Sequence, residues 1–268
     1  MSAIRVAIAG SAGRMGATLI EAVLADADLA LAAALEQRDH PALGRDVGEC
    51  VGRACGVLVS DDVAHALEGS DVLIDFTRPQ GTLAHLARCA ALGKSMVIGT
   101  TGFSVEENDR ITQAANAIAL VIAPNMAVGV NVVFKLAEMA ARTLGDGYDV
   151  EIVEAHHRHK VDAPSGTALK LGEMIAAARG RDLASCAVHG RHGDTGERDP
   201  RAIGFHALRG GDIVGEHTVL FAGSGERVEV SVRSASRMTY ALGALRAAKF
   251  LRGRAPGRYD MFDVLGIT

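Results

Sequence analysis

Four side chains that can carry a proton or a positive charge stand within five positions of this chain. They are His156, His157, His159 and Lys160, in the stretch EAHHRHKVDAPSGTA that covers residues 154–168. Histidine both binds metal ions and transfers protons near neutral pH, so residue type alone leaves a metal site and a catalytic site open. Unliganded surface histidines are the third alternative.

A metal site at this stretch needs two or three neutral imidazoles that converge on one ion. Side chains alternate faces along a strand, so His157 and His159 share a side while His156 points away. Arg158 and Lys160 then crowd the ion with positive charge, and we expect no metal here. The same alternation prevents His156 and His157 from both facing a substrate unless the backbone bends or one histidine stands behind the other.

The residues that follow predict a helix with an anion site at its start. Ser165 is the expected N-cap of a helix that runs to about Arg179. The backbone N–H groups of Gly166 and Thr167 then point at any anion, and Gly166 has no side chain to keep a carboxylate away. Lys160 and a protonatable histidine beside such a site favour proton donation to a small carboxylate substrate.

A second candidate site lies near the beginning of the chain. The sequence GSAGRMG has glycines at positions 10, 13 and 16, between a strand-like and a helix-like run. It is a variant of the G-x-G-x-x-G fingerprint, whose glycines let the backbone turn tightly and approach a pyrophosphate. An ordinary strand-to-helix turn is the alternative.

Two side chains strengthen the nucleotide interpretation. Glu36 follows Gly10 by 26 residues (36 − 10), near the usual distance for the carboxylate that accepts the ribose hydroxyls. Arg38 can instead pair with a 2′-phosphate. The pattern therefore predicts dinucleotide binding and leaves NADH and NADPH both open.

These sites need a scaffold, and the first 125 residues alternate between strand-like and helix-like patterns. This rhythm predicts a parallel α/β sheet, with ligands outside the carboxyl ends of its strands. The expected strands are 4–10, 29–36, 56–60, 71–77, 95–101 and 117–125, and the expected helices include 79–92 and 104–116.

After residue 125 the pattern changes to that of a second domain of α+β type. We expect a helix over 128–145, a strand over 148–157, a long surface loop over 180–201 and a last helix over 236–251. The last helix has a serine as its candidate cap and is expected to pack back on the first domain. Three strand-like runs joined by glycine turns predict an antiparallel meander; they are 202–209, 212–223 and 226–234.

Composition restricts the class of protein. With 268 residues, of which 49% are hydrophobic, the chain can bury a substantial core in one large domain or two of ordinary size. Its net charge of −4 gives no basic field for nucleic acid but permits a local cationic pocket. The four cysteines show no C-x-x-C pair and are expected to be reduced thiols. Without a signal peptide or a bilayer-length apolar run, we expect a cytoplasmic protein that binds neither nucleic acid nor membrane.

Seven segments together resemble the 4-hydroxy-tetrahydrodipicolinate reductase family, also called dihydrodipicolinate reductases. They are GSAGRMG, DFTRP, VIGTTG, APNMAVGVN, EAHHRHKVDAPSGTA, GERDPRAIGFHALRGGDIVGEHTVLF and SASRMTYA. The resemblance runs nearly from end to end. Its histidine-lysine-SGT segment is highly specific to that family, whereas many dehydrogenases share the glycine loop.

The resemblance implies the NAD(P)H-dependent reduction of 4-hydroxy-tetrahydrodipicolinate to tetrahydrodipicolinate with loss of water, in the diaminopimelate route to lysine. His156 matches the family's proton donor and Lys160 its second catalytic residue, and which of the two delivers the proton stays open. His157, Gly166 and Thr167 match substrate contacts. A reductase of another small oxo- or imino-dicarboxylate is the alternative function.

The resemblance also implies a cofactor site and a domain plan. A Rossmann-like dinucleotide-binding domain comprises 1–127 and 237–268, and 128–236 is an inserted substrate-binding and oligomerisation domain of a homotetramer. Where the enterobacterial form has glutamate followed directly by arginine, this chain has Gln37 between Glu36 and Arg38, which leaves the nucleotide preference open. With Arg38 included, the expected cofactor residues are Gly10, Ser11, Ala12, Gly13, Arg14, Met15, Glu36, Arg38, Gly99, Thr100, Thr101, Ala123, Pro124, Asn125 and Met126.

Overall fold

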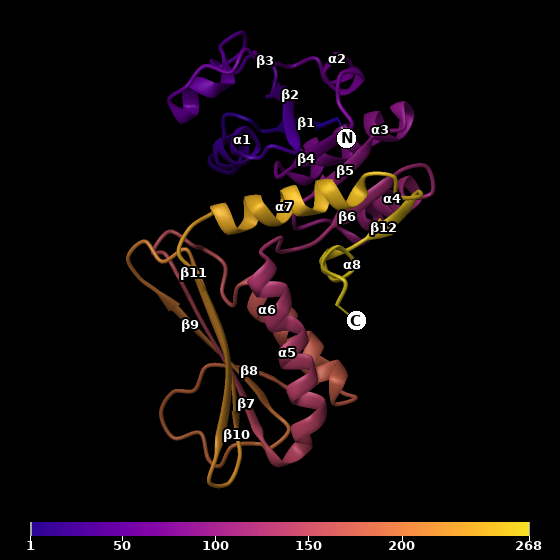
Figure 1. The fold of residues 1–268 in the computed structure, drawn as a ribbon. Coiled ribbons are helices and arrows are strands. Elements are labelled where there is room, and N and C mark those ends of the chain that lie inside the picture. Colours follow the sequence, from indigo (N-terminus) through magenta and orange to yellow (C-terminus); the bar gives the residue numbers. More distant parts are fainter. Residues whose placement is uncertain (1, 268) are drawn as a thin grey trace. The chain divides into compact units, whose positions relative to one another are not determined.

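The computed structural model describes residues 2–267, which form two compact units. The first unit runs to Val128 and resumes at Arg237, and the second is Gly129–Ser236. Each unit has one sheet of its own (Figure 1). In the described part of the chain, no helix is long and apolar enough to cross a membrane.

The first unit is built on a seven-stranded sheet whose strand pairs are all parallel. The strand order is β12-β6-β5-β4-β1-β2-β3, so the order reverses at β1. Open α/β sheets bind their ligands at such a reversal, outside the carboxyl ends of the strands. The strands are β1 (Ile4–Ala9), β2 (Leu29–Leu35), β3 (Val59–Ser60), β4 (Val72–Asp75), β5 (Ser95–Ile98), β6 (Ala119–Ile122) and β12 (Gly257–Tyr259).

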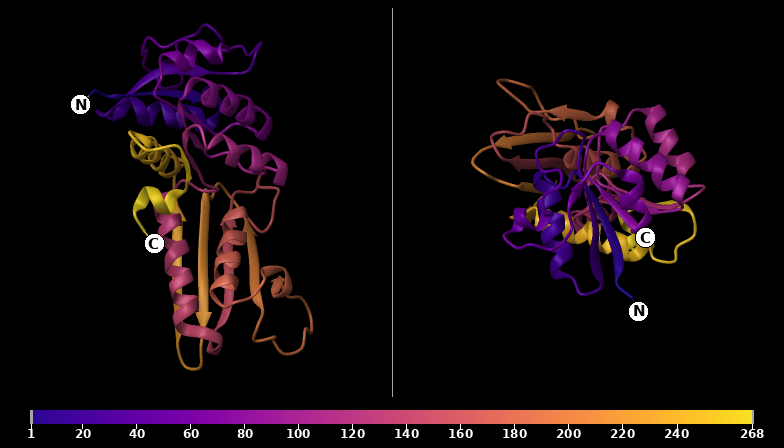
Figure 2. Two further views of the ribbon diagram at one scale, coloured as in Figure 1. Left: turned by 90° about the vertical axis from the view of Figure 1, so that its right-hand side faces the viewer. Right: turned by 90° about the horizontal axis from the view of Figure 1, so that it is seen from above.

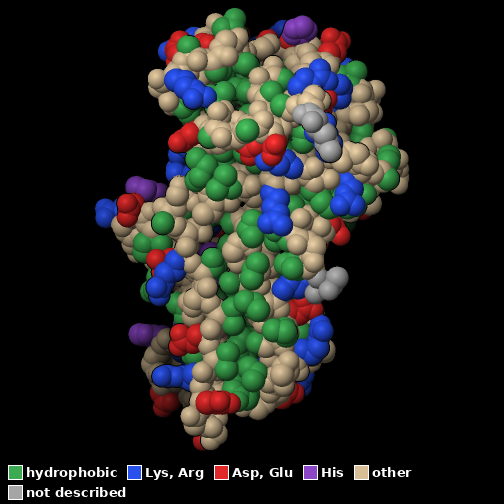
Figure 3. Space-filling view, viewed as in Figure 1, with side chains coloured by type: hydrophobic (Ala, Val, Ile, Leu, Met, Phe, Trp, Pro, Cys, Tyr) green, Lys and Arg blue, Asp and Glu red, His purple; other side chains and the backbone are tan. Residues whose placement is uncertain are grey.

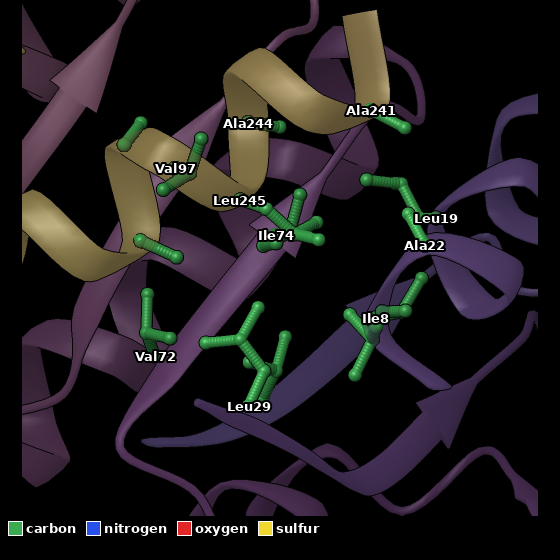
Figure 4. Packing of buried hydrophobic residues seen from close by; sticks show 14 of the residues in the cluster. Ile8, Leu19, Ala22, Leu29, Val72, Ile74, Val97, Ala241, Ala244 and Leu245 are labelled. Atoms are coloured by element: carbon green, nitrogen blue, oxygen red, sulfur yellow. The ribbon is translucent and has the colours of Figure 1, made fainter. Parts of the chain in front are cut away.

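Helices cover this sheet and close its core. Figure 4 shows Ala244 and Leu245 of the last long helix near Ile74 of β4, with Leu19 of the first helix close by. The last helix thus packs on the first unit, as predicted, because its small and apolar residues fit against the strands. Its Gly243 is required, since a Cβ there would lie 1.7 Å from the carbonyl oxygen of Met126. The helices are α1 (Arg14–Ala25), α2 (Val63–Glu68), α3 (Pro79–Leu92), α4 (Val105–Ala114), α7 (Met238–Leu251) and α8 (Met261–Leu265), with the 3₁₀ turn η1 (Val47–Val51).

The second unit is a five-stranded mixed sheet with two helices on one face (Figures 1 and 2). Its strand order is β11-β10-β7-β9-β8. The strands are β7 (Asp149–His156), β8 (Ala187–His189), β9 (Ile203–Arg209), β10 (Gly215–Ala222) and β11 (Arg227–Ser234). The helices are α5 (Val128–Leu144) and α6 (Gly166–Ala178), with the 3₁₀ turns η2 (Gly145–Gly147) and η3 (Leu183–Ser185).

The predicted antiparallel meander is only partly correct. Strands β10 and β11 form an antiparallel hairpin, but β7 lies between β9 and β10. The glycine turn after β9 therefore crosses over β7 instead of forming a hairpin. At that turn, the N–H of Gly210 donates to the carbonyl of His156, which ties the turn to the end of β7.

Smaller differences have local causes. Of the expected strand 56–60 only two residues pair with β2, because the N–H of Val59 and the carbonyl of Val57 bond back to residues 45–47. The loop expected over 180–201 contains η3 and β8, and three-residue β12 was not predicted. Helix α7 has Arg237, not a serine, at its N-cap.

Candidate functional site

The glycine loop after β1 forms a tight turn into α1. Gly10 has a φ of +68°, which favours glycine, and the N–H of Gly13 donates to its carbonyl at 3.0 Å. A Cβ at Gly16 would lie 2.2 Å from that same carbonyl oxygen. The N-cap Gly13 has no side chain, so α1 begins without a side-chain cap on its first N–H groups.

Two polar groups beside this loop are suited to a nucleotide. Glu36, just after β2, accepts the N–H groups of Ala12 at 3.2 Å and of Gln37 at 3.0 Å, so its carboxylate lies against the loop. Ser11 is fully buried, and its hydroxyl has no hydrogen-bond partner in the described residues. The side chain of Arg38 is 86% exposed, and its ion pair with Asp61 is long, at 4.0 Å. The side chain is therefore free to move towards a phosphate.

A buried carboxylate organises the neighbouring strand ends. Asp75 closes β4 and accepts hydrogen bonds from the backbone and hydroxyl of Thr77, from the hydroxyl of Thr82 and from Nδ1 of His85. Burial works to raise the pKa of Asp75, but the hydrogen bonds from His85 and Thr77 hold it below its usual range. The Thr82 hydroxyl bonds in turn to Thr100, one of the predicted cofactor residues.

The predicted cofactor residues come together at one edge of the sheet. They follow β1, β2, β5 and β6, whose carboxyl ends share that edge because the strands are parallel. The glycine turn, the uncapped helix start and the orphaned Ser11 hydroxyl fit a pyrophosphate, and the Glu36 carboxylate fits ribose hydroxyls. The residues present are therefore suited to a dinucleotide.

In the second unit, the histidine stretch begins where β7 ends. His156 is the last residue of the strand, and the chain then turns, with the N–H of Lys160 donating to the carbonyl of His157. The backbone thus bends after His156, which is one of the two alternatives that the sequence allowed for this stretch. After the bend, the ring centroids of His157 and His159 lie 6.2 Å apart.

Glu154 is the residue on which this stretch is built. Its side chain is 1% exposed, and both of its oxygens accept two hydrogen bonds. One oxygen accepts from Nδ1 of His156 at 2.6 Å and from Nη1 of Arg209 at 2.7 Å. The other accepts from Nη2 of Arg209 at 2.7 Å and from the N–H of Ser165 at 3.0 Å. Burial works to raise the pKa of Glu154, but these donors hold it below its usual range.

Helix α6 begins as the sequence predicts. The Ser165 hydroxyl caps it by accepting the N–H of Ala168 at 3.2 Å, and the same hydroxyl hydrogen-bonds Nε2 of His217 at 2.9 Å. A Cβ at Gly166 would meet nothing within 4 Å, so the space in front of the helix start is open. The backbone N–H groups of Gly166 and Thr167 belong to the first turn of α6, where the positive end of the helix dipole favours an anion.

Charge and burial set the protonation of the two inner histidines. Burial, together with the charges of Lys160 and Arg209, lowers the pKa of His156, although the Glu154 carboxylate works to raise it. Burial lowers the pKa of His217 to about 4, with the neighbouring ring of His156, 5.1 Å away, adding to this effect. Lys160 is near enough that its charge lowers both values, and its ammonium pairs with Asp162 at 2.8 Å.

One further atom is available to a ligand. Nδ1 of His157 is buried and has no hydrogen-bond partner among the described residues. Buried polar atoms are normally paired, so an orphan marks a place for water or ligand. Within residues 2–267, no group of three or more histidine, cysteine, aspartate and glutamate side chains is arranged to hold a metal ion.

Sequence reasoning missed four side chains of these sites: Asp75, Glu154, Arg209 and His217. A signal for one of them was present, since Glu154 and His156 are two residues apart on a predicted strand and so share a face. Asp75 lies in the first unit, at the end of β4, and the remaining two come from strands far from β7 in the sequence. Arg209 ends β9 and His217 lies opposite Glu154 on β10, and no local pattern joins them to β7.

Known proteins match this chain over its full length. A family model described as dihydrodipicolinate reductase, N-terminus, matches residues 4–126, and its C-terminal counterpart matches residues 129–265. The chain is 61% identical over 267 residues to 4-hydroxy-tetrahydrodipicolinate reductase of Dechloromonas aromatica, covering 100% of both. It is 60% identical to the enzyme of that name from Aromatoleum aromaticum, covering 100% of this chain and 97% of the relative.

Solved structures agree with this likeness. A dipicolinate-bound dihydrodipicolinate reductase from Paenisporosarcina sp. TG-14 has a TM-score of 0.75 and 27% identity, covering 97% of this chain and 98% of its own. GenD2 from gentamicin A biosynthesis, in complex with NAD, has a TM-score of 0.63 over 99% of this chain and 91% of its own. At 16% identity the second likeness concerns the fold alone.

Proposed function

The chain belongs to the dihydrodipicolinate reductase family, and on that premise we propose that His156 is the proton donor in its reaction. The reaction is the NAD(P)H-dependent reduction of 4-hydroxy-tetrahydrodipicolinate to tetrahydrodipicolinate, in the diaminopimelate route to lysine. One observation carries the proposal for His156: within the described residues, the only hydrogen bond of its ring is from Nδ1 to Glu154, which leaves Nε2 for a substrate.

The chemistry requires an acid at this place. Loss of water from the substrate leaves a ring with conjugated carbon–carbon and carbon–nitrogen double bonds. When bound, the nicotinamide nucleotide supplies a hydride to one end of this system. The electron pair displaced to the other end is then quenched by a proton, so one hydride and one proton are added and one water is lost. A positioned acid contributes about 10² to 10⁴ in rate.

The substrate has two carboxylates, and the second unit offers donors for both. We propose that the N–H groups of Gly166 and Thr167 hold one of them at the start of α6. Lys160 and the unpaired Nδ1 of His157 are available for the other. The relative from Paenisporosarcina binds dipicolinate, a planar dicarboxylate of similar spacing, which supports a dicarboxylate pocket here.

Each unit has its own task in this proposal. The first unit, expected from the sequence as 1–127 with 237–268, binds NADH or NADPH along the expected residues at the carboxyl edge of its sheet. The second unit, expected as 128–236, binds the substrate and mediates oligomerisation. The fit of the glycine loop, Ser11 and Glu36 to a dinucleotide supports the first assignment. We place the protein in the cytoplasm, on the composition and cysteine pattern of its sequence.

We propose a homotetramer, and the exposed surfaces of the second unit support it. The two helices lie on one face of its sheet, and in the described residues no helix covers the other face (Figure 2). Apolar side chains also gather along α5 (Figure 3), where Val132, Leu136 and Met139 are 39%, 41% and 60% exposed. Sedimentation velocity distinguishes the 27.9 kDa chain from a species of four times that mass.

The first prediction concerns the proton donor. Replacing His156 by Gln should lower kcat by about 10² to 10⁴ with little change in nucleotide affinity, because the ring serves only the chemical step. The rate is measured as NADH or NADPH oxidation with substrate generated from pyruvate and aspartate semialdehyde by the upstream synthase. His159→Gln, an exposed histidine of the same stretch, is the matched control. A His156 variant within threefold of wild type would remove His156 from this role.

The second prediction concerns the nucleotide. Glu36 favours free ribose hydroxyls and exposed Arg38 favours a phosphate, so we expect both nucleotides to serve with less than about tenfold preference, or about 1.4 kcal/mol. Arg38→Ala should raise the KM for NADPH more than that for NADH. Arg45→Ala, which removes an exposed arginine paired with Glu49, is the control. Equal effects of Arg38→Ala on both KM values would show that Arg38 does not reach the phosphate.

The third prediction concerns the carboxylate donors. Pyridine-2,6-dicarboxylate has the substrate's carboxylate spacing but does not readily accept hydride, so it should inhibit competitively against the dicarboxylate substrate. Lys160→Ala should weaken inhibition by about 1.5 to 3 kcal/mol, roughly ten- to 150-fold, as for a hydrogen bond to a charged group. Gly166→Val should weaken it by blocking the helix start, and it is compatible with the fold because a Cβ there meets open space.

Calorimetric titration with NADH is the control for both variants, since neither residue belongs to the nucleotide unit. If the inhibition constant were unchanged in Lys160→Ala and in Gly166→Val, the anion site would lie elsewhere.

A further inference from the structure

The buried carboxylate of Glu154 joins three parts of the substrate unit that the reaction needs together. It contacts the His156 ring, the residue that caps α6 and, through Arg209, the turn that bears Lys160. We propose that Glu154 is a positioning residue that fixes the tautomer and orientation of His156. It also holds the anion-binding start of α6 at a fixed position relative to the His156 ring, and Arg209 is its counter-ion. This inference rests on the role proposed above for His156.

The hydrogen bonds of Glu154 show that it is ionised and that it accepts a hydrogen bond from a proton-bearing Nδ1 of His156. A carboxylate has about four acceptor sites, and all four are filled, by His156, Ser165 and two nitrogens of Arg209. Arginine and a backbone N–H can only donate, and the paired Arg209 helps to hold the pKa of Glu154 below its usual range, so the carboxylate is ionised and accepts from Nδ1 of His156. The ring proton is therefore on Nδ1 when the ring is neutral, and Nε2 is the nitrogen that gains and gives the catalytic proton.

The same carboxylate sets the distance between acid and anion site. His156 and Ser165 are nine positions apart in the chain, yet both donate to Glu154. Ser165 precedes Gly166 directly, so the N–H groups proposed to bind the substrate carboxylate are fixed relative to the acid by one intervening side chain. Placement of reacting groups to a fraction of an ångström is worth large factors in rate.

Arg209 completes the arrangement from the neighbouring strand. It binds Glu154 with both terminal nitrogens, and Nη2 also donates to the carbonyl of Asp162 at 2.7 Å. Asp162 lies in the turn after His156 and pairs with Lys160. An ion pair as buried as this one stabilises little by itself, because desolvation offsets its attraction, so a positional role accounts for it better than a stabilising one.

The chain contains a matched control on the same strand. Glu151 also lies on β7 and also binds arginine and histidine side chains, namely Arg191, Arg198 and His206. It contacts none of the residues proposed to act on the substrate. Glu154→Gln and Glu151→Gln therefore remove the same charge from similar partners, and only the first removes it from His156.

The first test compares these two variants kinetically. A glutamine amide must turn its NH₂ group either to the His156 proton or to the donors of Ser165 and Arg209, so Glu154→Gln should lower kcat by about 10- to 100-fold, the usual range for the loss of an outer-shell partner. Because the lost carboxylate stabilised the imidazolium, the high-pH limb of the kcat/KM profile should move to lower pH. Glu151→Gln should leave kcat within about twofold of wild type and the limb in place. An unmoved limb in Glu154→Gln, or an equal shift in both variants, would overturn the proposal.

The second test needs no substitution at Glu154 and stands even if that variant does not fold. Nitrogen-15 NMR of wild-type protein distinguishes the two neutral tautomers of a histidine ring, and the His156 signals are assigned by their absence from His156→Gln. We expect the Nδ1–H tautomer above the titration of the ring. An Nε2–H tautomer would contradict the positioning role. The activity of wild type against His156→Gln reports separately on the proposed function, so the two ideas fail by different results.

Discussion

Burying a carboxylate costs free energy unless its oxygens accept hydrogen bonds and a cation compensates its charge. Glu154, 1% exposed, meets this condition with one arginine, one histidine and one backbone N–H. Each of its donors comes from a different element, so satisfying the carboxylate fixes β9, the end of β7 and the start of α6 together. The placement of His156 relative to the start of α6 follows from that requirement.

The nucleotide unit also contains a buried carboxylate whose oxygens accept hydrogen bonds, at the end of a strand of its parallel sheet. Asp75 at the end of β4 is also fully buried and also accepts from a histidine, with threonine hydroxyls in place of arginine. Through Thr82 it reaches Thr100 after β5, so it connects two strand ends at the ligand edge of the sheet. In each unit, a buried carboxylate holds a residue that is expected to contact a ligand, His156 in one and Thr100 in the other.

The local parts of this arrangement could be predicted from the sequence and the distant parts could not. The N-cap at Ser165 and the turn at Gly10 depend on neighbouring residues, and the structure agrees with both. The pairing of β9 with β7 brings Arg209 to a carboxylate 55 positions away, and no turn or periodicity encodes such a contact. The glycine turn after β9, which the sequence predicts to be a hairpin, is therefore a crossover in the structure. The spacing of Glu154 and His156 on one strand was a local signal, but the contacts of Glu154 with Arg209 and Ser165 could be seen only in the structure.

Proton uptake on ligand binding tests the central claim, that His156 is the proton donor beside the dicarboxylate pocket, most directly. In the free protein, burial lowers the pKa of His156, and a dianionic ligand beside the ring should raise it again by stabilising the imidazolium. Titration of pyridine-2,6-dicarboxylate by calorimetry near pH 7, in buffers of different ionisation enthalpy, counts the protons taken up. The claim predicts uptake of up to one proton in wild type and a loss of that uptake in His156→Gln. Binding without uptake, or with equal uptake in the variant, would contradict it.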